Sequence, residues 1–162
     1  MCIRDRLPAS AGAVTCPNAD RPAESTGDIA WRNSVVCLIN QERTRNHRRP
    51  LHNISALRTG AQNYSSYMVA HHTFSHNNLE ARFKSSGYLR GMSDWGMGEN
   101  ILWGGLPQFT PQDAVRLWLA SPHHRANLLS PAWKDTGVGI SQYSPAGQYG
   151  WTAVQWFGER YR

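Results

Sequence analysis

The sequence predicts an α+β domain in which helices cover a small antiparallel sheet. Two observations support this prediction. Helical periodicity recurs in stretches between residues 35 and 120, and two strand-like stretches joined by a turn follow residue 135. The 162 residues fit a single compact domain. No apolar run approaches the roughly 18 residues of a membrane-spanning helix. We therefore expect a soluble domain at residues 31–162, preceded by an N-terminal arm at residues 1–30.

The start of the arm is not expected to contribute to the fold. Residues 1–6 read MCIRDR, which is the translation of a transposon end sequence used in DNA library preparation, so we interpret them as an adapter artefact. Residues 7–13 are interpreted as a signal-peptide remnant, because Ala11 and Ala13 fit an A-x-A cleavage site before Val14. A flexible linker explains the same small residues.

Two cysteines remain once residues 1–6 are set aside. Cys16 and Cys37 form an even set in a chain with an export signal, which predicts one disulfide. Such a bridge would tie the arm to the first helix and would stabilise the fold by about 3 kcal/mol on the chain-entropy model. The alternative is two free thiols in a cytosolic protein. A zinc ribbon is not indicated, because the sequence contains no C-x-x-C pair.

The first helix is predicted from Val35, Leu38, Ile39 and Glu42 and is expected to end at Pro50. Four arginines lie in its last part: Arg43, Arg45, Arg48 and Arg49. We interpret them as a solvated helix end, where positive charge suits the helix dipole, in preference to a polyanion site.

Two further helices follow. Apolar residues recur at spacings of three and four from residue 54 to residue 68, which predicts a helix ending near His72. A third helix is predicted after Thr110, which can act as its N-cap, with Pro111 at the first helical position and Asp113 in the first turn.

The strands are predicted last in the chain. Residues 136–143 and 149–158 carry the alternation and the β-branched and aromatic residues of strands, and SPAGQ between them is the turn of an antiparallel hairpin. A short strand is also expected to begin at GEN, residues 98–100.

Five motifs carry a family resemblance. They are FSH at 74–76, GENILWG at 98–104, W-x-x-SPHHRANLL at 118–129, GVGI at 137–140 and WTAVQWFG at 151–158. In this order they resemble the CAP superfamily of cysteine-rich secretory, antigen 5 and plant pathogenesis-related proteins, in its bacterial SCP-like form. The resemblance covers about Val35 to Gly158. It implies an α-β-α sandwich, secretion to the extracellular space, and a central cleft with histidine and glutamate side chains, but no general catalytic activity.

Residue by residue, the resemblance transfers only part of that cleft. His76 matches the first family histidine and Glu99 the first glutamate. Ser121 and Gly150 stand where eukaryotic members have a second glutamate and a second histidine. The bacterial form instead supplies the histidine that matches His124. We do not expect the adjacent His123 to face the same site, because neighbouring helical residues point about 100° apart.

Three roles are open for His76, Glu99 and His124. Two imidazoles and a carboxylate, with water in a fourth position, suit zinc or another divalent metal. Without a metal, the carboxylate can orient a histidine that acts as an acid or a base. The structural alternative is a hydrogen-bonded network that joins the three motifs. Trp95 and Trp103 flank GEN and are expected to line a groove beside the cleft.

The leading functional hypothesis is a secreted, non-catalytic binding module for an apolar or cell-envelope ligand, such as a lipid. The alternative is a metal-dependent hydrolase that uses His76, Glu99 and His124. A nucleic-acid partner is disfavoured, because secretion and scattered arginines fit it poorly. The sequence gives no basis for an oligomeric state.

Overall fold

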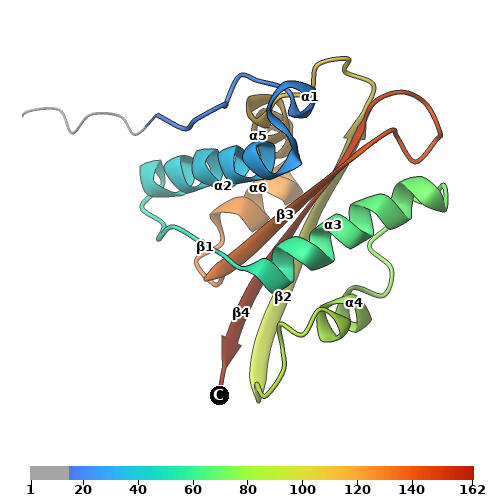
Figure 1. The fold of residues 1–162 in the computed structure, drawn as a ribbon. Helices are drawn as coiled ribbons and strands as arrows, with labels where there is room; N and C mark the ends of the chain where they lie inside the picture. The colour runs from blue at the N-terminus through green and yellow to red at the C-terminus, as the bar shows by residue number, and fades with distance from the viewer. Residues whose placement is uncertain (1–14) are drawn as a thin grey trace, which may run out of the picture.

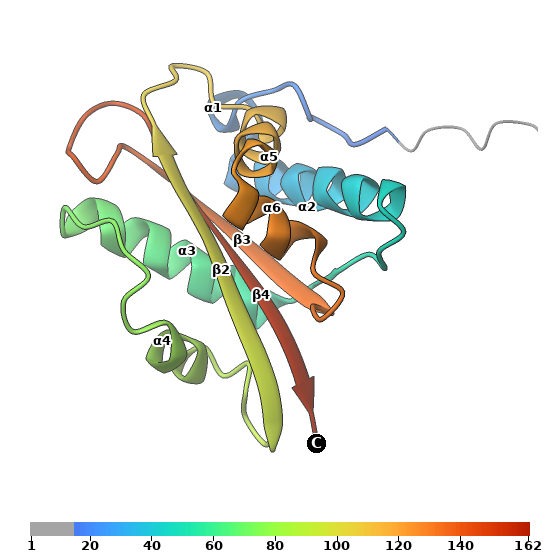
Figure 2. The same ribbon diagram turned by 180° about the vertical axis from the view of Figure 1, so that it is seen from behind.

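The computed structural model describes residues 15–162, which form three layers. Helices α1, α2, α5 and α6 cover one face of a central sheet, and α3 and α4 cover the other (Figure 1, and Figure 2 from behind). The interpretations made for residues 1–6 and 7–13 lie outside the described residues. The α+β class and the α-β-α sandwich are confirmed.

The helices have the following bounds: α1 Ala23–Thr26, α2 Asp28–Arg45, α3 Ser55–Ala70, α4 Leu79–Ser85, α5 Pro111–Ala120 and α6 Pro122–Leu129. The three predicted helices correspond to α2, α3 and α5. Helix α2 begins before residue 30, so the expected N-terminal arm extends too far into the domain. At α5 the predicted cap forms a full capping box, in which Thr110 accepts from the backbone of Asp113 and the Asp113 carboxylate accepts from the backbone of Thr110.

The sheet contains four strands: β1 His52–Asn53, β2 Asp94–Gly104, β3 Asp135–Gln142 and β4 Trp151–Tyr161. Their order is β1-β3-β4-β2, with β2–β4 and β3–β4 antiparallel and the two-residue β1 parallel to β3. The predicted hairpin is therefore β3–β4, and the sheet is mixed because of β1. GEN lies in the middle of β2, and the strand already begins at Asp94, earlier than the sequence indicated.

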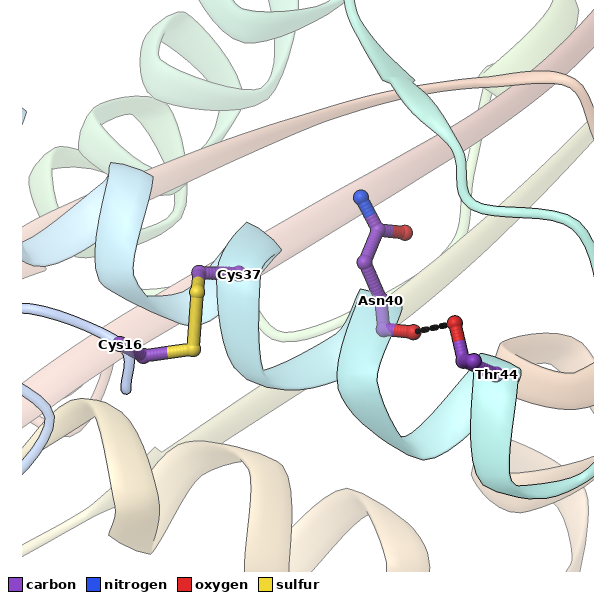
Figure 3. The surroundings of a disulfide bond; sticks show 4 residues. All are labelled: Cys16, Cys37, Asn40 and Thr44. Atoms are coloured by element: carbon purple, nitrogen blue, oxygen red, sulfur yellow. Dashed lines mark hydrogen bonds between the residues drawn. A yellow bond between two sulfur atoms is a disulfide. The ribbon is translucent and has the colours of Figure 1, made fainter. Parts of the chain in front are cut away.

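The predicted disulfide is confirmed. Cys16 and Cys37 are joined, with Cα atoms 5.7 Å apart, and the bond fixes the segment before α1 to the middle of α2 (Figure 3). One turn further along α2, Thr44 donates a hydrogen bond to the carbonyl of Asn40. The bridge therefore holds the start of the described chain against the first long helix.

The arginine cluster requires a correction at Arg43, which was expected in solvent and is only 1% exposed. Its guanidinium donates to the carbonyls of Leu128 at 2.7 Å, Arg49 at 2.8 Å and Ser130 at 3.1 Å. Burial, and then the charge of Arg48, lower the pKa of Arg43. These carbonyls include the C-terminal end of α6, where a cation suits the helix dipole. Arg43 is thus a structural cation that joins α2 to α6.

The close approach of α3 to the sheet depends on Gly139 of β3. A Cβ atom at this position would lie 2.4 Å from backbone atoms of Ala61 and Gln62. A glycine in this strand lets the backbones of the helix and the strand come together, and the GVGI motif therefore positions α3.

We predict that Gly139→Ala destabilises the domain by about 1–3 kcal/mol, because the added methyl group meets helix backbone that cannot rotate away. The matched control is Gly104→Ala on β2, where an added Cβ meets nothing within 4 Å. This substitution should change the free energy of unfolding by less than about 1 kcal/mol. Urea denaturation of the oxidised protein measures the free energy of unfolding of both variants. Equal stability of the two variants would contradict the proposed packing of α3 on β3.

Candidate functional site

The candidate site is centred on the carboxylate of Glu99, in the middle of β2. His76 Nδ1 lies 2.9 Å from Glu99 Oε1. The Trp156 indole N–H donates to Oε2 at 2.8 Å. Arg82 forms a two-pronged ion pair with the carboxylate, with N–O distances of 2.5 Å and 3.1 Å. These contacts bring together β2, β4, α4 and the loop after α3.

The contacts of the Glu99 carboxylate lie in the interior of the domain. The Glu99 side chain is 1% exposed and that of Arg82 is 15% exposed, whereas His76 is 56% exposed. An ionised carboxylate at such a position requires a nearby cation and hydrogen-bond donors. The planar guanidinium of Arg82 suits this role because it pairs with both carboxylate oxygens. The Arg82 guanidinium also stacks on the ring of Tyr64, 3.4 Å from the ring centre.

Local packing places Trp156 beside Glu99. The two residues are direct partners in the β2–β4 register. The indole of Trp156 lies against α3 at Gly60, where a Cβ atom would lie 2.1 Å from a ring carbon. Gly60 therefore leaves the room that lets the indole N–H reach the carboxylate.

His124 approaches the same region from α6. Burial, and then the positive charges of His76 and His123, lower the pKa of His124. His124 is half-buried and biased toward its neutral form, whereas His123 is exposed. This matches the expectation that the two adjacent histidines face different surroundings.

Asparagines fix α6 to β2. The Asn100 amide donates to the carbonyl of His124 at 3.1 Å, and the Asn127 amide donates to the Asn100 side-chain oxygen at 2.9 Å. Asn127 also donates to the carbonyl of Glu99 at 3.3 Å. Hydrogen bonds therefore join FSH to GEN and GEN to SPHHRAN, as the structural alternative requires.

The predicted metal ligands do not fit a metal ion as they are arranged. Both oxygens of Glu99 already accept from Arg82, and the carboxylate also accepts from Trp156 and contacts His76. The guanidinium occupies the position next to the carboxylate that a cation would need. Across residues 15–162, the structure contains no group of three or more His, Cys, Asp or Glu side chains that could hold a metal ion. Metal binding by His76, Glu99 and His124 stays a prediction, and it would require Arg82 to leave the carboxylate.

A cleft of about 660 Å³ lies beside the Glu99 network, between α3 and α4. Arg82, Tyr64 and Trp156 belong to both the network and the wall of the cleft. Neither Trp95 nor Trp103 is among its lining residues. Trp95 packs at the start of β2 near Lys84, and Trp103 at the other end is 43% exposed. The groove expected between these two tryptophans is thus not this cleft.

Sequence reasoning missed Arg82, Tyr64 and Trp156 as members of the site. A glutamate on the apolar face of a strand implies a buried cation, which was the available signal for an arginine partner. Which arginine supplies that charge depends on how the loop after α3 folds back. The sequence of that loop has no periodic pattern from which its course could be predicted.

We predict that Glu99→Gln destabilises the domain by about 3 kcal/mol or more, because it leaves the buried guanidinium of Arg82 without its counter-charge. The matched control is Glu80→Gln, which breaks an exposed ion pair with Lys84 whose side chains are 54% and 59% exposed. This control substitution should lower the free energy of unfolding by less than about 1 kcal/mol. Chemical denaturation at neutral pH compares the two variants, and similar losses would contradict a structural role for the buried carboxylate.

Comparison with known proteins identifies the family of the chain. The family model for the cysteine-rich secretory protein (CAP) family matches residues 36–156. The uncharacterized protein YkwD of Bacillus subtilis (strain 168) is 30% identical over 138 residues, which cover 83% of this chain and 52% of YkwD. This chain therefore spans about half the length of that relative.

Solved structures share the fold. An extracellular SCP-domain protein from Bacillus anthracis superposes with a TM-score of 0.67 and 24% identity, over 82% of this chain and 41% of that one. An outer surface protein from Borrelia burgdorferi superposes with a TM-score of 0.65 and 18% identity, over 78% of this chain and 90% of that one. Within residues 15–162, the helices are too short or too polar to cross a membrane. The motifs, the fold and the family match agree, and the chain belongs to the cysteine-rich secretory protein (CAP) family.

Proposed function

We propose that this domain is a secreted, non-catalytic binding module that holds a cell-envelope ligand in the cleft between α3 and α4. The observation that supports this most is the cleft itself. Its volume of about 660 Å³ falls in the range of small-ligand sites. It lies directly beside a rigid, buried ion pair, so its wall is organised before a ligand arrives.

The absence of catalysis is supported by the hydrogen-bond partners of the reactive side chains. Across residues 15–162, no serine, threonine or cysteine side chain is hydrogen-bonded to a histidine, as an activated nucleophile requires. Ser121 links α5 to α6 and makes no side-chain capping bond. The Glu99 carboxylate is engaged by Arg82 and is not free to accept a proton from a substrate.

The extracellular location is supported by two observations. The Cys16–Cys37 disulfide is typical of oxidising compartments. The Bacillus anthracis and Borrelia burgdorferi proteins are described as extracellular and as an outer surface protein. An envelope component is the ligand source that such a location supplies.

We predict that the oxidised domain sediments with purified Bacillus subtilis cell walls in a saturable manner. Asn63→Trp, which places a large side chain on the cleft side of α3, should weaken this binding about tenfold or more, because the indole fills space that the ligand needs. Asn33→Trp is the matched control, since Asn33 is also an exposed helical asparagine but lies on α2, across the sheet.

The walls are compared with vesicles of equal parts phosphatidylglycerol and phosphatidylethanolamine. Binding to either preparation that Asn63→Trp weakens and Asn33→Trp preserves supports the proposed module. Failure to bind both preparations, or equal effects of the two substitutions, would overturn it.

A further inference from the structure

The chemistry of the α3–α4 cleft indicates its ligand class, which extends the proposed function and rests on it. We infer that the cleft binds a short, neutral oligosaccharide. Three properties of the wall carry this inference: its hydrogen-bonding groups, its aromatic surface and its lack of free charge.

The wall is rich in neutral groups that both donate and accept hydrogen bonds. Eight of its residues carry a side-chain amide or an aliphatic hydroxyl: Thr59, Asn63, Thr73, Ser75, Asn77, Asn78, Ser85 and Ser86. Sugar hydroxyls also donate and accept, so each can pair with such groups in either direction. A ligand with many hydroxyls matches this set better than one with a single polar end.

The amides at the rim of the cleft are available to a ligand. Among the described residues, the side chains of Asn63, Asn77 and Asn78 make no hydrogen bond to the protein, and all three are exposed. In the free domain they bond to water. A ligand can replace that water without breaking any contact that holds the fold.

An aromatic surface lies along the α3 side of the cleft. The Tyr67 ring is 49% exposed and stacks on His71 at 4.0 Å and on Tyr64 at 6.0 Å between ring centroids. A pyranose ring presents C–H bonds on one face and hydroxyls around its edge. The flat, electron-rich face of tyrosine packs well against such C–H groups, while the surrounding amides reach the hydroxyls.

The charge balance of the wall disfavours the other envelope ligands. Its guanidinium, Arg82, is neutralised by Glu99, so it offers no free cation to a phosphate or a carboxylate. No lining residue is acidic, and none carries an aliphatic side chain that would hold an alkyl tail. An anionic lipid headgroup therefore lacks a counterpart here, and an alkyl tail would meet only the aromatic rings.

The test is calorimetric titration of the oxidised domain with neutral tetrasaccharides of N-acetylglucosamine, glucose or mannose, and with glycan fragments released from cell walls by muramidase. We expect at least one of these to bind saturably. Tyr67→Ala should weaken that binding about tenfold or more, because it removes the stacking face, whereas Tyr67→Phe should stay close to wild type. The matched control is Tyr149→Ala. Tyr149 is 50% exposed, and its hydroxyl donates a hydrogen bond to Glu24. Glu24 belongs to α1, which lies on the opposite face of the sheet from the cleft.

Each outcome decides between the two claims. Wall or vesicle sedimentation without binding of any tetrasaccharide or wall glycan would overturn the oligosaccharide inference and leave the binding module standing. Saccharide binding that Tyr67→Ala and Tyr149→Ala weaken equally would also overturn it. Saccharide binding with the expected Tyr67 dependence but no sedimentation would support the inference and overturn the envelope assignment.

Discussion

The buried ion pair between Glu99 and Arg82 is the interaction on which the rest of this structure depends. It places a charge in the interior of the domain at the middle of β2, and that charge is tolerated because a guanidinium and an indole N–H meet it. The partners come from α4, from β4 and, through His76, from the loop after α3. One carboxylate therefore fixes the relative positions of segments that lie far apart in the sequence.

The same interaction determines what the site can do. Because Arg82 holds both oxygens, the carboxylate is structural, and His76 shares it with a guanidinium that already balances its charge. Arg82 also forms part of the wall of the cleft between α3 and α4. The motifs that identify the family thus build a rigid support, and the cleft beside that support is the surface available to a ligand.

Local patterns made much of the fold predictable. The capping box at Thr110 and the hairpin of β3 and β4 follow from signals within a few residues, and the disulfide followed from the cysteine count together with an inferred secretory context. The contact between His76 and Glu99, and the hydrogen bond that joins β2 to α6 at the carbonyl of His124, agree with the order of the family motifs. The length of β2 was missed because the glycines at 96 and 98 lower strand propensity, although the strand is held by pairing along all of β4.

The long arginine side chains could not be placed from the sequence. Arg43 and Arg82 each find partners that are distant in the chain or on another element, and neither partner has a periodic signal. Arg43 looks like part of a solvated cluster until α6 is positioned against it. The cleft was missed for a related reason, because many of its lining residues are polar side chains that pattern analysis assigns to solvent.

Anomalous diffraction at the zinc edge, from crystals of the oxidised domain grown with excess zinc, tests the role of the Glu99–Arg82 pair most directly. The account predicts no anomalous peak among residues 76, 99 and 124, with Arg82 still paired to Glu99. A peak bound by His76, Glu99 and His124 at about 2.0–2.2 Å, with the guanidinium displaced, would contradict it.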